Sequence, residues 1–186
     1  MSRIKVISHN EATGRLKEIY DELIVKRGKL AEVHTIQSLR PESIVAHMDL
    51  YMEIMYSRSE LSRAEREMMA VVVSKTNGCV YCQKHHAEAL NNYWKDAGKT
   101  ENFRVSYRDV HLSDKELMLC RFAEQLTKNP QSAEKIDITE DLKNAGLNDS
   151  AILDATLIVA YFNFVNRIVL ALGVELETDS GTGYKY

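Results

Sequence analysis

Two cysteines and a histidine stand at spacings that support thiol chemistry. Cys79 and Cys82 form a Cys-x-x-Cys pair, and His86 follows Cys82 by four residues. On one helix these three side chains share a face, because residues three, four and seven apart lie on the same side. The start of a helix lowers the pKa of a thiol and so favours the nucleophilic thiolate. The spacing predicts a redox-active thiol pair beside an imidazole.

Glu67 lies twelve residues before the pair and opens the apolar run 68–73. An enclosed carboxylate needs a hydrogen-bond partner, and we expect Glu67 and His86 to form a proton relay. In the expected reaction this relay deprotonates a thiol, the thiolate attacks the O–O bond of a hydroperoxide, and the second thiol closes a disulfide. The helix dipole favours Cys79 as the attacking thiol, whereas the spacing to His86 favours Cys82, which we prefer.

Other uses of these residues remain open at this point. Cys79, Cys82, His86 and Glu67 could together bind zinc, but the chain has no second Cys/His pair that would close a structural site. The thiols could also be purely structural. We predict no metal and no bound cofactor. Cys120 is expected to be a buried core thiol, and the other histidines without visible partners are treated as structural: His9, His34, His47 and His111.

The composition indicates one globular domain and restricts its partners. The 186 residues are 45% hydrophobic and 27% charged, and the net charge of −3 offers no basic surface for nucleic acid or anionic lipid. No apolar run reaches the ~20 residues of a membrane span without interruption by polar groups, and the N-terminus lacks the features of a secretion signal. One Cys-x-x-Cys among three cysteines is typical of a reducing compartment, so we expect a cytoplasmic protein.

The apolar periodicity and the low proline content predict an all-α fold. Helices are expected over residues 11–28, 31–39, 42–56, 63–76, 79–96, 113–128, 139–146 and 148–172, with residues 99–112 as loop. Ser62 with Glu65, and Ser113 with Glu116, are capping boxes. The Met and Tyr residues of 42–56 are expected to face the core rather than a pocket.

Smaller signals concern the ends of these helices and the contacts between them. Asn77-Gly78 should end one helix and reverse the chain before the cysteines. Thr139 should cap the short helix that ends at Gly146. The amides of Asn163 and Asn166 lie in an apolar helix and need partners, most simply in an inter-helix or subunit contact. A weak similarity between two segments that lie 86 residues apart in the chain suggests an internal two-fold repeat of a helix-turn-helix unit.

The pattern Glu67, Cys79, Cys82 and His86 resembles that of the AhpD alkylhydroperoxidase group within the carboxymuconolactone decarboxylase family. The segments 79–90 and Tyr-Phe-Asn-Phe-Val-Asn-Arg at 161–167 are similar to its peroxidase-related branch. The resemblance covers most of residues 11–176. It implies an AhpD-like helical bundle, a homo-oligomer (trimer or hexamer), and thiol-dependent reduction of organic hydroperoxides or hydrogen peroxide, driven by an external dithiol or protein reductant. It also implies that Cys82 attacks the peroxide and that Cys79 resolves.

The chain departs from that pattern at one position. AhpD carries a histidine directly before its second cysteine, where this chain has Tyr81. Tyr81 or His85 could take over the hydrogen bond of the absent histidine. We expect residues 1–176 to form a single AhpD-like domain and 177–186 to form a mobile C-terminal tail.

Two alternative functions follow from the same residues. The replacement of the relay histidine by Tyr81 favours a redox-sensing or stress-response module with little turnover. The decarboxylase chemistry that gives the family its name is the less favoured alternative, because it does not use a Cys-x-x-Cys pair.

Overall fold

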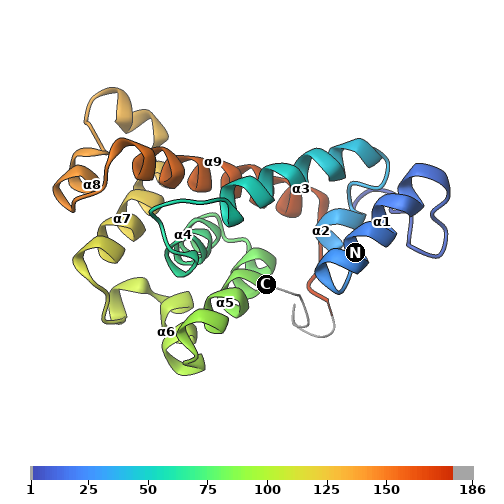
Figure 1. Ribbon diagram of the computed structural model, residues 1–186, viewed down its shortest axis with the longest axis horizontal. Coiled ribbons are helices and arrows are strands. Elements are labelled where there is room, and N and C mark those ends of the chain that lie inside the picture. The colour runs from blue at the N-terminus through green and yellow to red at the C-terminus, as the bar shows by residue number, and fades with distance from the viewer. Residues whose placement is uncertain (1, 178–186) are drawn as a thin grey trace.

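The chain folds into helices joined by short connections (Figure 1). The computed structural model describes residues 2–177, and within that range it contains no strand, so the all-α prediction is confirmed. The helices are α1 (Gly14–Arg27), α2 (Glu32–Thr35), α3 (Pro41–Tyr56), α4 (Arg63–Thr76), α5 (Val80–Trp94), α6 (Ala97–Val105), α7 (Asp114–Lys128), α8 (Glu140–Asn144) and α9 (Asp149–Leu172). Two short 3-10 turns cover Tyr107–Asp109 and Pro130–Glu134.

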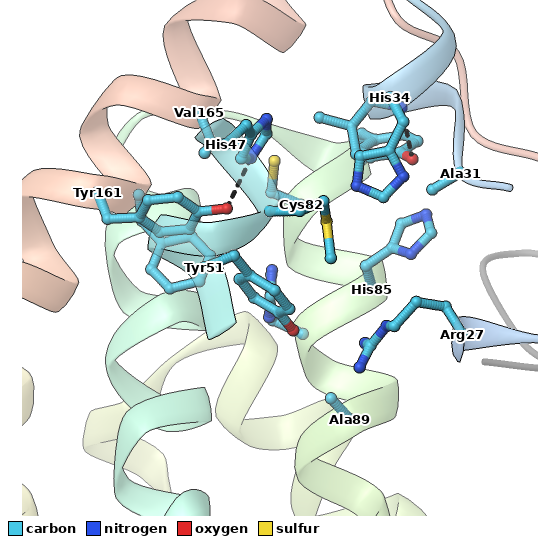
Figure 2. Close-up of a pocket in the computed structure, with 15 residues that line it drawn as sticks. Arg27, Ala31, His34, His47, Tyr51, Cys82, His85, Ala89, Tyr161 and Val165 are labelled. Atoms are coloured by element: carbon cyan, nitrogen blue, oxygen red, sulfur yellow. Dashed lines mark hydrogen bonds between the residues drawn. The ribbon is translucent and has the colours of Figure 1, made fainter. Parts of the chain in front are cut away.

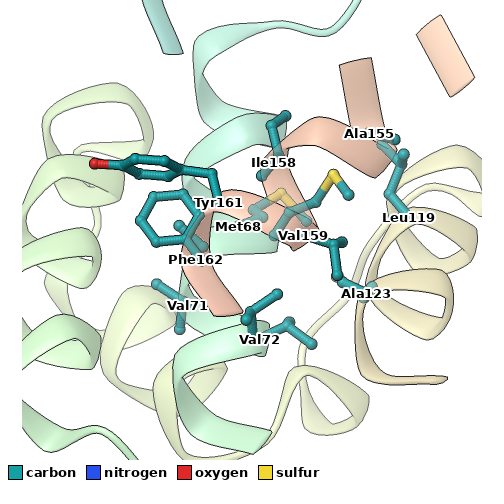
Figure 3. Close-up of a cluster of buried hydrophobic side chains, with 14 of the residues drawn as sticks. Met68, Val71, Val72, Leu119, Ala123, Ala155, Ile158, Val159, Tyr161 and Phe162 are labelled. Atoms are coloured by element: carbon teal, nitrogen blue, oxygen red, sulfur yellow. The ribbon is translucent and has the colours of Figure 1, made fainter. Parts of the chain in front are cut away.

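Helix α4 is the centre of the core, and its neighbours are α5, α7 and α9. The predicted capping box starts it: the Ser62 hydroxyl accepts from the Glu65 N–H at 3.2 Å, and the Glu65 carboxylate accepts from the Ser62 N–H at 2.7 Å. Every residue from 65 to 74 is buried. Figure 3 shows Met68 of α4 packed with Leu119 of α7 and Ile158 of α9. Burial of such side chains stabilises the fold by about 1.5–3 kcal/mol each.

A second, smaller cluster joins the N-terminal helices to α3. It contains Leu16, Ile19, Tyr20 and Leu23 of α1 and Ile44 of α3. In Figure 1 the blue helices α1 and α2 lie together at one end of the molecule, beside α3 and the end of α9. This placement brings α2 close to the first turns of α5, which matters for the site described below.

Helix α9 is long and apolar enough, by length and composition alone, to cross a membrane. It packs against α3, α4 and α7. Of its most apolar stretch of 18 residues, 44% is buried inside the fold. The core helix of a globular protein has the same character. In the suggested repeat of 86 residues, residue 163 would correspond to Asn77, where the turn between α4 and α5 lies. Helix α9 is unbroken at residue 163, so the described chain does not repeat that turn.

Three local predictions were wrong. Residues 99–112 were expected to be loop, but they contain most of α6, which Asp96 caps by accepting from the Lys99 N–H at 2.9 Å. Helix α5 ends at Trp94 rather than at residue 96, because Lys95 adopts a left-handed conformation (φ 54°). Thr139 makes no capping bond, because its hydroxyl donates to Asp137 instead.

Candidate active site

A tight turn between α4 and α5 places the cysteine pair. Gly78 has φ +72°, a left-handed conformation that strains any other residue. The Cys79 N–H donates to the Ser74 carbonyl at 2.9 Å and thereby fixes the start of α5. On the other side the Asn77 amide donates to the side-chain oxygens of Asn163 and Asn166, at 3.1 and 3.0 Å. The predicted inter-helix role of the two α9 asparagines is confirmed, and it holds the turn against α9.

Glu67 is fully buried and lies between the side chains of Arg63 and His86. Its Oε1 accepts from Arg63 at 2.8 Å, and its Oε2 lies 2.7 Å from Nδ1 of His86. One carboxylate oxygen thus binds Arg63 and the other binds His86. A carboxylate that binds Nδ1 orients the ring and leaves Nε2 free of this contact, an arrangement suited to a carboxylate–histidine pair.

Sequence reasoning did not single out Arg63, although a signal was present. Arg63 and Glu67 are four residues apart on α4, the spacing at which opposite charges on a helix meet. The Arg63 guanidinium also stacks on the Tyr56 ring at 3.5 Å. Arg63 is thus the residue that makes a fully buried carboxylate tolerable.

The two thiols of the pair are both buried, and no disulfide joins them. The side chains of Cys79 and Cys82 share a hydrogen bond. That bond lowers the pKa of Cys79 despite its burial, whereas the same bond and burial raise the pKa of Cys82. Charge therefore rests more easily on Cys79, but only Cys82 lines the pocket beside the pair. Because one hydrogen bond joins the two sulfurs, transfer of its proton to Cys79 moves the charge onto Cys82.

Cys82 opens into a pocket of about 90 Å³ formed by α2, α3, α5 and α9 (Figure 2). One water needs about 10–15 Å³ of such space, so the pocket holds a molecule of several heavy atoms. His85 and His86 border it on the α5 side. The prediction that the Met and Tyr residues of α3 face the core was partly wrong, since Met48 and Tyr51 line this pocket.

The wall opposite α5 is built by residues that the sequence analysis had treated as structural. His34 of α2 and His47 of α3 line the pocket, and both are buried. Burial lowers the pKa of His34 to about 3 and that of His47 to about 4, so both rings are neutral at pH 7. Nδ1 of His34 has no hydrogen-bond partner within residues 2–177. Tyr161 of α9 completes this wall with its hydroxyl 2.7 Å from Nε2 of His47.

Tyr81 and His85 belong to a separate hydrogen-bonded group at the pocket rim. The Tyr81 hydroxyl donates to Oε1 of Glu177 at 2.9 Å, and His85 Nε2 lies 2.8 Å from Oε2 of the same carboxylate. The two rings are in contact, tilted by 35° with centroids 4.3 Å apart. Glu177 was assigned to the mobile tail, but it is held in place by these contacts and by the Glu32 N–H at 3.1 Å. Residues 178–186 of that segment lie outside the described residues.

The zinc alternative requires several metal-ligating side chains to converge on one point. Within residues 2–177 no three Cys, His, Asp or Glu side chains are placed to hold a metal ion together. Cys120, on α7, is fully buried, and burial raises its pKa well above the ordinary range of a thiol. It is the core thiol that was predicted.

Comparison with known proteins agrees with the fold. The described helices define an AhpD-like all-α protein, and the model of the carboxymuconolactone decarboxylase family matches residues 41–101, which include the Glu67, Cys79, Cys82 and His86 pattern. This segment is similar to the carboxymuconolactone decarboxylase family, and the fold of the described chain is AhpD-like. No significant match was found among curated proteins.

Three solved structures share the fold over nearly the whole chain. An uncharacterised peroxidase-related protein of Ralstonia eutropha JMP134, described as an AhpD core, is 23% identical with a TM-score of 0.86, over 97% of this chain and 94% of that one. A peroxidase-related protein of Silicibacter sp. TM1040 is 25% identical with a TM-score of 0.84, over 99% and 96%. The debrominase Bmp8 is 17% identical with a TM-score of 0.79, over 96% and 94%. A cysteine-to-alanine variant of Bmp8 was solved with 2,3,4-tribromopyrrole.

Proposed function

We propose that the protein is a thiol-dependent peroxidase that reduces small organic hydroperoxides or hydrogen peroxide. One observation carries this proposal. Cys82 is the thiol that borders the small pocket, Cys79 is hydrogen-bonded behind it, and the buried Glu67–His86 pair lies beside it. These are the three requirements of the reaction: a thiol that the oxidant reaches, a second thiol that resolves, and a base that removes a proton.

The steps balance without a metal or an organic cofactor. His86 Nε2 takes one proton from the thiol pair, and the Cys82 thiolate attacks one peroxide oxygen. The O–O bond breaks, and the departing oxygen takes up the proton as alcohol or water. Cys79 then displaces water from the Cys82 sulfenic acid and forms the disulfide. One hydroperoxide and two thiols give one alcohol, one water and one disulfide, which an external dithiol reduces again.

The first test is peroxide consumption in the presence of dithiothreitol. Wild type should turn over, Cys82→Ser should not, and Cys120→Ala serves as the control because Cys120 is a buried thiol that does not line the pocket. After one equivalent of peroxide, mass spectrometry should find a loss of two hydrogen atoms that links Cys79 to Cys82. Turnover by wild type no faster than by Cys82→Ser would refute the peroxidase proposal.

The redox-sensor alternative gives a different result in the same experiment. A sensor would form the Cys79–Cys82 disulfide with one equivalent of peroxide but would not turn over with dithiothreitol. Size measurements on the oxidised and reduced protein would then show a change of assembly. An unchanged assembly would exclude this alternative.

A second candidate is reductive dehalogenation of a small halogenated ring. It is favoured by the aromatic pocket lining of Tyr51, Tyr161 and Phe162 and by the shared fold of the debrominase. Two thiols and one carbon–bromine bond would give a carbon–hydrogen bond, bromide, a proton and the same disulfide. Bromide release from 2,3,4-tribromopyrrole, compared with peroxide turnover, separates the two functions.

The same proposal includes an assembly and a compartment. Leu153, Leu157 and Phe164 are exposed apolar residues of α9, and we propose that they form a contact in a homo-oligomer, a trimer or hexamer as in the AhpD group. Multi-angle light scattering measures the subunit number directly, and a monomer at micromolar concentration would contradict it. A reducing compartment such as the cytoplasm would supply the dithiol that the reaction needs.

A further inference from the structure

The pocket wall opposite Cys82 contains a hydrogen-bonded chain whose direction can be derived. The Gln37 amide nitrogen lies 2.8 Å from the Val33 carbonyl, which is only an acceptor, and this contact fixes which end of the amide is the donor. The same nitrogen lies 2.8 Å from Nδ1 of His47. His47 therefore accepts at Nδ1. Because its ring is neutral, its hydrogen is on Nε2.

The direction continues to Tyr161. Nε2 of His47 donates to the Tyr161 oxygen across 2.7 Å, so the hydroxyl hydrogen of Tyr161 must point elsewhere. No acceptor for it is found within residues 2–177, and Tyr161 lines the pocket. Figure 2 shows Tyr161 reaching from α9 to His47, in the wall of the pocket that Cys82 also lines. Burial raises the pKa of Tyr161 well above 10, so the group remains a donor at any working pH.

We propose that Tyr161 is a catalytic hydrogen-bond donor: its hydroxyl, oriented by Gln37 and His47, stabilises the departing oxygen when Cys82 attacks a hydroperoxide. This role rests on the proposed peroxidase function and deepens it. In the attack the S–O bond forms as the O–O bond breaks, and negative charge develops on the oxygen that leaves. A donor that is already aimed at this charge lowers the barrier. Tyr161 keeps its own proton, and the leaving oxygen receives the one that His86 took from the thiols, through water in the pocket.

Gln37 and His47 are positioning residues in this scheme. They do not touch the oxidant, but they determine that the Tyr161 hydrogen faces the pocket rather than His47. Without the Gln37 donor, His47 could move its hydrogen to Nδ1 and accept from Tyr161 at Nε2. The Tyr161 hydrogen would then turn away from the pocket.

The test compares two oxidants that differ in their leaving groups. tert-Butyl hydroperoxide releases a strongly basic alkoxide, whereas peracetic acid releases a carboxylate that carries its charge without help. In single-turnover oxidation of the Cys79–Cys82 pair, Tyr161→Phe should slow tert-butyl hydroperoxide about 100-fold, the loss typical of one such donor. It should slow peracetic acid much less. Gln37→Leu should give the same pattern with a smaller loss.

Tyr51→Phe is the matched control, because it removes another hydroxyl from the same pocket, one to which the structure assigns no hydrogen bond within residues 2–177. It should affect both oxidants alike. Alkylation of Cys82 by iodoacetamide and the melting temperature report whether Tyr161→Phe disturbs the thiols or the fold.

The outcomes separate the role of Tyr161 from the peroxidase function. Equal losses with both oxidants in Tyr161→Phe, no loss at all, or leaving-group dependence in Tyr51→Phe instead would overturn the role of Tyr161 while the peroxidase proposal stands. A wild-type thiol pair that neither oxidant converts to the disulfide would overturn both.

Discussion

His85 and His86 are neighbours on α5, yet each is held by a different carboxylate in a different setting. His86 uses Nδ1 to bind Glu67, which is fully buried and also paired with Arg63. His85 uses Nε2 to bind Glu177 at the pocket rim, in a group completed by Tyr81. The first pair leaves Nε2 of His86 free of Glu67, on a ring that lines the same pocket as Cys82. The second ties the end of the described chain to α5.

The difference shows that one kind of ion pair serves two purposes according to its burial. A buried carboxylate without its partners would carry an uncompensated charge, so the Glu67 group must remain assembled whenever the protein is folded. The Glu177 side chain keeps a little contact with solvent, since 11% of it is exposed, so the loss of its charge should cost less than at Glu67. We therefore expect the Glu67 group to contribute to both stability and catalysis. The Glu177 group should contribute less to stability, by holding the end of the described chain against α5.

The largest expected effect is on stability. Glu67→Gln keeps the shape of the side chain but leaves Arg63 without its counter-charge, and we expect the free energy of unfolding to fall by about 3 kcal/mol. The matched change at the rim, Glu177→Gln, should cost less, about 1–2 kcal/mol, because the amide oxygen can still accept from Tyr81 or Glu32. Urea denaturation of the two variants measures both values. Equal losses would remove the distinction between the two carboxylates.

The next effect is on rate and compares the two imidazoles. His86→Gln removes the base beside Cys82, and we expect single-turnover oxidation by hydroperoxide to slow about 100-fold. His85→Gln should slow it by no more than about threefold, since its Nε2 is bound to Glu177 and it lies about 100° around the helix from His86. Stopped-flow measurement at one pH compares the two. A loss in His85→Gln as large as that in His86→Gln would mean that both imidazoles act as bases.

The smallest expected effect is the pH dependence of the stabilisation that Glu177 provides at the pocket rim. Burial favours the neutral acid of Glu177, but the hydrogen bond from His85 and the backbone N–H groups outweigh it and lower the pKa from 4.5 to about 2. The folded protein thus binds fewer protons at this site than the unfolded chain. The stabilisation is present above pH 4.5 and disappears as the pH falls to about 2.

The measurement is the difference in unfolding free energy between wild type and Glu177→Gln across this pH range. The difference should shrink towards zero as the pH falls. Glu88→Gln, which removes a charge elsewhere on α5, is the control. A difference that grows at low pH would contradict the expected sign.

Parts of the site could be predicted because their residues are close in the chain. Cys79, Cys82 and His86 share a helix face by spacing alone, and Glu67 lies on the preceding helix across one short turn. The capping boxes at Ser62 and Ser113 also follow from local chemistry, and the structure confirms both. Helix α6 was missed because Lys95, rather than a glycine, ends α5 in a left-handed conformation.

The opposite wall of the pocket could not be predicted in this way. His34, His47 and Tyr161 come from three separate helices, and no spacing along the chain relates them. Glu177 lies 92 residues from its partner His85, so nothing in the sequence marked it as a member of the site.

The sequence by itself determined the helices and the reactive face of α5, because periodicity, caps and residue spacing act within a few turns of one helix. Only the tertiary structure decided which thiol borders a pocket, which carboxylate each histidine meets, and which way the Tyr161 hydrogen points. Those properties depend on burial and on contacts between helices that are distant in the chain, and both arise when α2, α3, α5 and α9 pack together.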